Sequence, residues 1–127
     1  MKPPKWAENL LLEALTWWES QGNQVPTPEL RWIRRNRFTS AGKGCSEYIK
    51  ISAGHNRLHA KILLLHETAH AIVGRDGAKW HSSHFWDVTW ALYRWARLPI
   101  RYCRQIEGNY RKGALMGYRR SIRKEVL

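Results

Sequence analysis

The chain has little cysteine and no long apolar run. Its 127 residues include two cysteines, Cys45 and Cys103, whose spacing gives neither a disulfide framework nor a C-x-x-C pair. No stretch approaches the length of a membrane span, and the amino terminus lacks the apolar run of a signal peptide. We therefore expect a cytoplasmic protein with no membrane partner.

Acidic residues are also scarce. Ten Asp and Glu stand against 22 Lys and Arg, which gives a formal net charge of +12. This excess favours anionic partners, and non-specific nucleic acid binding through the basic surface is the first candidate, although a protein can also be simply basic. Aromatic residues, in contrast, are plentiful: eight Trp and five Tyr indicate a core rich in large rings, or rings reserved for a binding surface.

The central motif is a pair of histidines four residues apart, His66 and His70, with Glu67 directly after the first. Apolar residues recur at intervals of three and four over residues 58–72, which is typical of an amphipathic helix, and Gly74 is expected to end it. Side chains four apart project from one face of a helix, so both imidazoles can bind the same metal ion. Glu67 can then take a proton from the water that attacks a peptide carbonyl, as in the H-E-x-x-H zinc peptidases.

A catalytic zinc ion usually has three protein ligands, so a third ligand is required. The candidates in the sequence are Asp76, His81 and His84. Asp76 stands ten residues beyond His66, where the metzincin pattern places its third ligand, but that pattern needs a glycine where this chain has Val73. His81 and His84 follow a turn that can fold the next helix back over the site.

The residues before the motif helix predict a β-hairpin. Residues 30–38 alternate partly between polar and apolar and are expected to form a strand. Residues 39–44 have the composition of a turn, and residues 48–52 read as a second strand. The two strands should therefore pair antiparallel. Asn56 is placed to cap the motif helix.

Further helices are expected on both sides of this central unit. The apolar pattern predicts one helix over residues 6–20 and another that is capped by a serine before Phe85 and runs to about residue 97. The last 31 residues hold nine Lys or Arg and two Glu. We expect this basic segment to form one or two short helices that are broken near Gly108, Gly113 and Gly117.

The sequence of residues 64–71, LLHETAHA, resembles the small SprT-like and minigluzincin-type zinc metallopeptidases. In those proteins an H-E-x-x-H-A helix is followed by a short turn and an H-G-x-x-F/W element. Here Arg75-Asp76-Gly77 follows the helix, and then His81-x-x-x-Phe85, in which Phe85 matches the ring that packs behind the third ligand. The resemblance covers about residues 45–97.

Carried over residue by residue, the resemblance implies a Zn²⁺ site with three ligands, His66, His70 and His81. It also implies that Glu67 is the catalytic general base. The chain departs from the family pattern at Ser82, where the family has glycine, so His84 stays an alternative third ligand.

The resemblance has two further implications. The strand nearest the metal helix, residues 48–52, would pair with an extended substrate peptide by β-augmentation. The family also includes proteases that act on DNA-bound proteins, so the basic carboxy-terminal segment would suit recruitment to DNA.

Together these features predict an α+β fold, with a small antiparallel sheet packed on the H-E-x-x-H helix and further helices before and after it. Residues 1–98 would form a metallopeptidase-like domain, and residues 99–127 a basic helical extension of the same compact unit. The predicted function is zinc-dependent hydrolysis of peptide bonds in a peptide or protein substrate. The alternative is a non-catalytic basic nucleic-acid-binding protein with a structural metal site, a reading that leaves Glu67 without a role.

Overall fold

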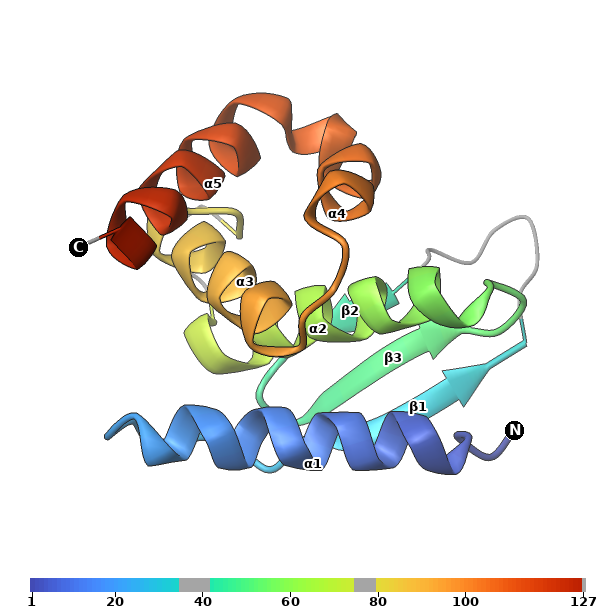
Figure 1. Ribbon diagram of the computed structural model, residues 1–127. Coiled ribbons are helices and arrows are strands. Elements are labelled where there is room, and N and C mark those ends of the chain that lie inside the picture. Colours follow the sequence, from blue (N-terminus) through green and yellow to red (C-terminus); the bar gives the residue numbers. More distant parts are fainter. Residues whose placement is uncertain (35–41, 75–79, 127) are drawn as a thin grey trace.

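Helices surround a small sheet in the computed structural model, which describes residues 1–34, 42–74 and 80–126 (Figure 1). The elements in chain order are α1 (Lys5–Ser20), β1 (Glu29–Ile33), β2 (Gly42–Gly44), β3 (Tyr48–Ser52), α2 (Arg57–Val73), α3 (Ser83–Trp95), α4 (Ile100–Ile106), the 3₁₀ helix η1 (Glu107–Tyr110) and α5 (Arg111–Val126). The α+β prediction is confirmed. No helix within these ranges has the length and apolar character needed to cross a membrane.

The sheet is mixed rather than antiparallel. Its strand order is β1-β3-β2, in which β1 runs parallel to β3 and β2 runs antiparallel to β3. The predicted hairpin between β1 and β3 is therefore wrong. The antiparallel partner is β2, a short glycine-rich edge strand that lies within the segment expected to be a turn. Residues 35–41, which complete the first expected strand and that turn, lie outside the described residues.

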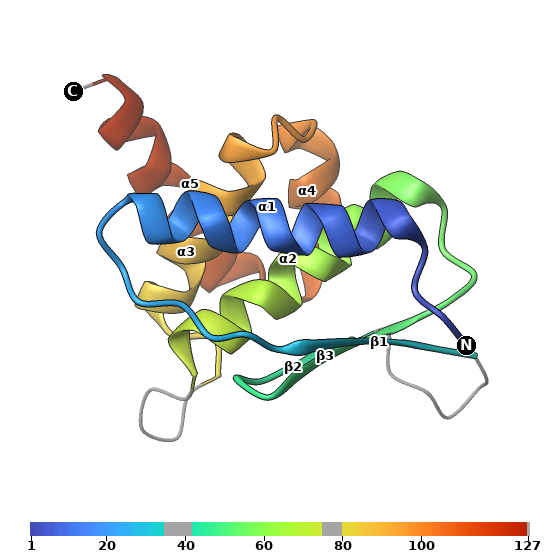
Figure 2. The same ribbon diagram turned by 90° about the horizontal axis from the view of Figure 1, so that it is seen from below.

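Two helices cover one face of the sheet, α1 and α2 (Figure 2). The side chains that meet between these layers form one core cluster, made of Ala7, Leu11, Leu15, Ile49, Ile51, Leu64 and Ala71. Ile49 and Ile51 alternate with outward residues along β3, as expected for a strand with one buried face. This packing fixes α2, and hence the H-E-x-x-H motif, over the centre of the sheet.

A second core cluster surrounds α3, which is buried between α2 and α5. Phe85, Trp86, Trp90 and Tyr93 are at most 1% exposed, so this core is dominated by rings, as the composition indicated. The carboxy-terminal segment thus packs on the same core as α2. Figure 1 shows α4 and α5 forming an arch above α2 and α3.

The predicted breaks at Gly113 and Gly117 are wrong, because α5 runs through both positions. A Cβ on Gly113 would lie 2.7 Å from Nε1 of Trp86, and one on Gly117 would lie 2.7 Å from Cβ of Trp86. The two glycines, four apart, therefore give α5 a flat face that lets it approach α3 closely. Only the expected break near Gly108 corresponds to a boundary, since Gly108 lies in η1 between α4 and α5.

The helix ends follow the capping chemistry of the sequence. The Asn56 side chain accepts a hydrogen bond from the backbone N–H of His59 and begins α2, and Gly74 ends α2 with φ of 69°. Ser82 accepts from the backbone N–H of Phe85 and begins α3. These caps determine where the motif helix stops and where the next helix starts, on either side of the candidate ligands.

Candidate metal centre

Three histidines from two elements meet at one point. His66 and His70 lie one turn apart on α2, and His81 precedes α3. One nitrogen from each ring can be chosen so that all three lie within 4.8 Å of one another. Nε2 of His70 and Nε2 of His81 are 3.2 Å apart. The three residues are therefore close enough to bind a metal ion.

A phenylalanine ring holds this cluster together. Phe85 stacks on His70 with ring centroids 4.2 Å apart, and its centroid lies 4.9 Å from that of His81 and 5.0 Å from that of His66. The cap at Ser82 starts α3 so that Phe85, in its first turn, is completely buried against α2. Ser82 thus has a structural role as the N-cap that starts α3 directly after His81.

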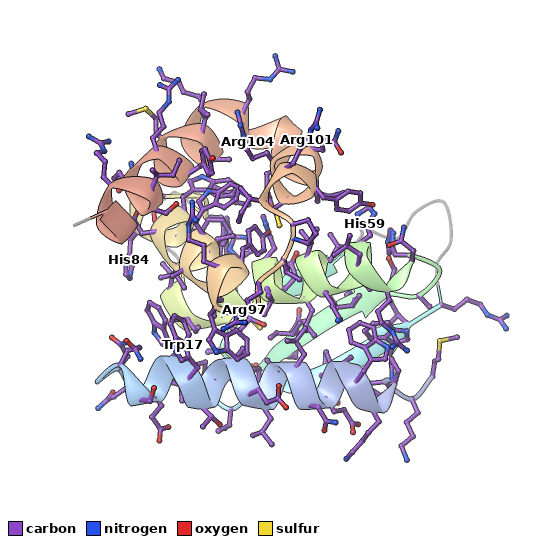
Figure 3. The ribbon with its side chains drawn as sticks, in the orientation of Figure 1. Trp17, His59, His84, Arg97, Arg101 and Arg104 are labelled. Carbon is purple, nitrogen blue, oxygen red and sulfur yellow. The ribbon has the colours of Figure 1, made fainter. Side chains whose placement is uncertain are left out.

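The two other candidates for the third ligand are not in this cluster. His84 is exposed on α3, at the edge of the molecule in Figure 3, and is not a member of the group that can share an ion. Asp76 lies outside the described residues. Among the described residues, then, the group that can share an ion is His66, His70 and His81.

Glu107, from the carboxy-terminal part of the chain, holds one of the histidines. Its Oε1 is 2.9 Å from Nδ1 of His66, and the hydroxyl of Tyr93 donates to the same oxygen at 2.6 Å. Glu107 is only 3% exposed. Because Nδ1 faces this carboxylate, Nε2 is the nitrogen through which His66 would bind a metal, the arrangement in which an outer carboxylate orients a ligating imidazole.

Sequence reasoning did not identify Glu107 or Tyr93. Glu107 lies 41 residues beyond His66, so no local motif links the two. One signal was available: Glu107 is one of two acidic residues in a segment with nine Lys or Arg. One of so few carboxylates in such a basic segment is a candidate for a buried partner.

The pKa values of the three histidines are shifted in different directions. Burial lowers the pKa of His70 to about 3 and that of His81 to about 4, and the charge on His66 adds to both shifts. Burial also lowers the pKa of His66, but its hydrogen bond and charge interaction with Glu107 outweigh this, so the net pKa is raised above the ordinary value. In the metal-free protein His70 and His81 are therefore neutral at pH 7, the state in which an imidazole can bind a metal.

Glu67 lies beside the histidines and is not a member of the group that can share an ion. It is 7% exposed, and burial raises the pKa of its carboxyl to about 7 in the metal-free protein. Strand β2 covers it closely. A Cβ on Gly42 would lie 3.0 Å from Oε2 of Glu67, and one on Gly44 would lie 2.8 Å from its carbonyl carbon, so the Gly-Lys-Gly sequence is what allows β2 to lie on α2.

The site opens into a pocket of about 560 Å³. Its walls are the three histidines and Glu67 on one side, with β2 and Trp80 on the others. Because β3 is already paired with β1 on one edge and β2 on the other, the expectation that residues 48–52 pair with a substrate peptide is wrong in this structure. The strand beside the pocket is β2.

The donor set fits a divalent transition metal. Three imidazoles are a common ligand set for catalytic zinc, in which a fourth position stays open. One further observation supports a functional site here. Nδ1 of His70 is buried and has no hydrogen-bond partner among the described residues. Buried polar atoms are nearly always paired, and the exceptions concentrate at sites where function sets the geometry.

Comparisons of the chain with protein-family models, with curated proteins and with solved structures found no match.

Proposed function

We propose that this protein is a metal-dependent peptidase of the SprT-like or minigluzincin type, with zinc held by His66, His70 and His81 and Glu67 as general base. The observation that carries the proposal is the convergence of three histidines beside a buried carboxylate that is not one of the shared ligand atoms. A ligand set with a separate, adjacent carboxylate is what hydrolysis by an activated water requires.

The chain's own residues would divide the chemistry between them. Zinc, when bound, supplies a Lewis acid that acidifies water and polarises the scissile carbonyl. Glu67 takes the proton of the attacking water and delivers it to the leaving amine. Glu107 and Tyr93 fix the orientation of His66. Strand β2, packed on Glu67 through Gly42 and Gly44, keeps bulk water from that side of the carboxylate.

The substrate would be an extended segment of a peptide or protein. Strand β2 is at the edge of the sheet and borders the pocket, so a peptide laid along it would pass in front of Glu67. Trp80, which is 40% exposed and whose ring lies 5.8 Å from that of His70, would form an apolar wall for a substrate side chain.

Zinc is the metal that the ligand type favours. Three imidazoles suit zinc, but they also bind Co²⁺, Mn²⁺ and Fe²⁺, so the identity of the metal is part of the proposal. A purely structural zinc site would usually be closed by a fourth protein ligand, often a cysteine. Cys103 is buried in the core cluster around α3, and neither it nor Cys45 is among the described residues that can share an ion with the histidines.

The test is hydrolysis by the zinc-loaded protein and by Glu67→Gln. With unfolded casein and a mixed pool of fluorogenic peptides as substrates, we expect the variant to keep its zinc and to lose activity by at least about 100-fold, since a positioned general base contributes 10²–10⁴-fold. Glu13→Gln, on the exposed face of α1, is the matched control and should retain full activity. Equal hydrolysis by Glu67→Gln and wild type would exclude Glu67 as the base.

A further inference from the structure

A second pocket lies on the other side of Glu107, between α4 and α5. Its volume is about 490 Å³. Three arginines line it, Arg101, Arg104 and Arg111. The remaining wall is formed mainly by apolar residues and Gln105. We call this the arginine pocket. It shares Glu107 with the metal centre and none of the three histidines.

The arrangement of the two helices explains why the arginines gather. Arg101, Arg104 and Gln105 are spaced three and four residues apart, so they lie on one face of α4, and Arg111, Ala114 and Leu115 share one face of α5 in the same way. The chain turns at η1 between the two helices, so the two faces lie opposite each other and line the same pocket. Figure 3 shows Arg101 and Arg104 side by side on α4, on the side of the molecule away from α1.

The floor of this pocket is rigid. Trp90 is 1% exposed, and its Nε1 donates to the backbone carbonyl of Ala114 at 2.9 Å. This bond ties α3 to α5 directly beneath the arginines. Arg104 is also fixed from the side, since its guanidinium lies 4.8 Å from the centre of the Tyr118 ring. The arginines are therefore carried by helices that are held together by specific contacts.

The positive charge of the arginine pocket is not neutralised from within the described chain. The lining holds three guanidiniums and one carboxylate, that of Glu107, which leaves a net charge of +2. The carboxylate is buried and already accepts from Tyr93 and pairs with His66. Neither Arg101 nor Arg111 forms an ion pair with a described residue. Three like charges around one cavity repel each other unless an anion joins them.

From this geometry we infer that the arginine pocket binds a phosphate group. Guanidinium groups bind phosphate through paired, charge-assisted hydrogen bonds, and several arginines together favour a group with more than one charge. A phosphate monoester carries about −1.5 to −2 charges near pH 7, which matches the +2 of the lining, whereas a simple carboxylate carries one. The phosphate can belong to a small phosphorylated compound, or adjacent phosphodiesters of a nucleic acid backbone, each with one charge, can together supply the same charge.

The inference is independent of the proposed peptidase activity, and its test uses metal-free protein. Isothermal titration calorimetry with pyrophosphate and with inorganic phosphate would compare wild type with two double variants. Arg101→Gln/Arg111→Gln removes two charges from the arginine pocket. Arg119→Gln/Arg123→Gln removes two charges from exposed positions of α5 outside the pocket. Circular dichroism would check that both variants fold.

We expect wild type to bind both anions, and to bind pyrophosphate more tightly than inorganic phosphate because pyrophosphate carries more negative charge. The pocket variant should weaken pyrophosphate binding by at least about tenfold, as the loss of two charge-assisted contacts requires, and the control variant by less than about twofold. Absence of pyrophosphate binding by wild type would overturn the inference. So would equal weakening in both variants, because it would show a diffuse effect of net charge.

A second titration identifies the source of the phosphate. A single-stranded oligonucleotide that competes with pyrophosphate, and that binds less tightly to the pocket variant than to the control variant, would assign the arginine pocket to nucleic acid backbone. An oligonucleotide that leaves pyrophosphate bound would assign it to a small phosphorylated compound. Both results support a phosphate site and differ only in its natural occupant.

Discussion

Glu107 connects two sites through a single carboxylate group. Its Oε1 accepts a hydrogen bond from the hydroxyl of Tyr93 and faces Nδ1 of His66. The Glu107 side chain also forms part of the wall of the arginine pocket. A buried carboxylate with two partners is well fixed, and an outer carboxylate of this kind raises the basicity of the imidazole that it holds. We therefore regard Glu107 as a positioning residue for the metal centre.

Replacing this carboxylate should weaken metal binding without removing a ligand. In Glu107→Gln the charge that favours the His66 ring is lost, and the new amide N–H₂ is buried among donors. We expect zinc affinity to fall about 10- to 100-fold, the usual effect of changing an outer-shell partner. Competition with a chromophoric chelator measures this directly.

The matched control for that prediction is Glu13→Gln, which makes the same chemical change at an exposed position. Chemical denaturation of the metal-free proteins separates the effect on zinc from any effect on folding. An unchanged zinc affinity in Glu107→Gln would mean that packing alone, through Phe85 and its neighbours, orients His66.

At the level of single residues, the sequence was informative where the chemistry is local. His66, Glu67 and His70 lie within one helical turn, so their spacing alone places them on one side of α2. His81 needed the family pattern, because a turn separates it from the helix. Glu107 could not be placed, since its approach to His66 depends on the path of α3, α4 and η1 together.

The glycines of α5 show how one helix is fitted to another. Glycine in a helix interior is unfavourable by about 1 kcal/mol relative to alanine, which is why breaks were expected at Gly113 and Gly117. Both positions instead contact Trp86, and Gly117 also contacts Trp90. The packing of two tryptophans against a flat helix face outweighs the local preference of the chain.

Alanine at Gly117 should therefore destabilise the protein, although helix propensity alone predicts a gain. The added Cβ would lie 2.7 Å from Cβ of Trp86 and 3.0 Å from Cδ1 of Trp90, and both tryptophans are only 1% exposed in the core. We expect the free energy of unfolding to fall by about 1–3 kcal/mol, as is typical of overpacking. Urea denaturation of metal-free protein gives the value.

Gly108→Ala is the control for this change. No atom lies within 4 Å of a Cβ built at Gly108, so its substitution should alter the free energy of unfolding by less than about 0.5 kcal/mol. If Gly117→Ala were as stable as Gly108→Ala, α5 would not be packed on α3 as described.

The strands were harder to predict than the helices. Residues 48–52 form β3 as expected, but the pairing partner was misidentified because a hairpin is the commonest link between neighbouring strands. Strand β2 has three residues, two of them glycine, so its composition resembles a turn. Its extended form depends on contact with Glu67 of α2, a tertiary contact that no local pattern reveals.

On the scale of the whole molecule, the basic carboxy-terminal part is integrated with the metal centre. Helix α5 packs on α3, Glu107 in η1 holds His66, and the arginine pocket lies between α4 and α5. Some of the basic residues thus line a defined cavity, and others are dispersed over the surface. Arg120 shows the contrast, since it is paired with Asp87 at 2.7 Å and serves to attach α5 to α3.

Elemental analysis of the purified protein measures whether His66, His70 and His81 form one metal site. Wild type should contain about one zinc per chain after zinc is supplied, since each of the three histidines contributes one ligand. His81→Ala should lose the metal, whereas His84→Ala, an exposed histidine on α3, should keep it. Wild-type protein that takes up no metal, or metal lost from His84→Ala and kept by His81→Ala, would show that these three histidines do not form a metal site.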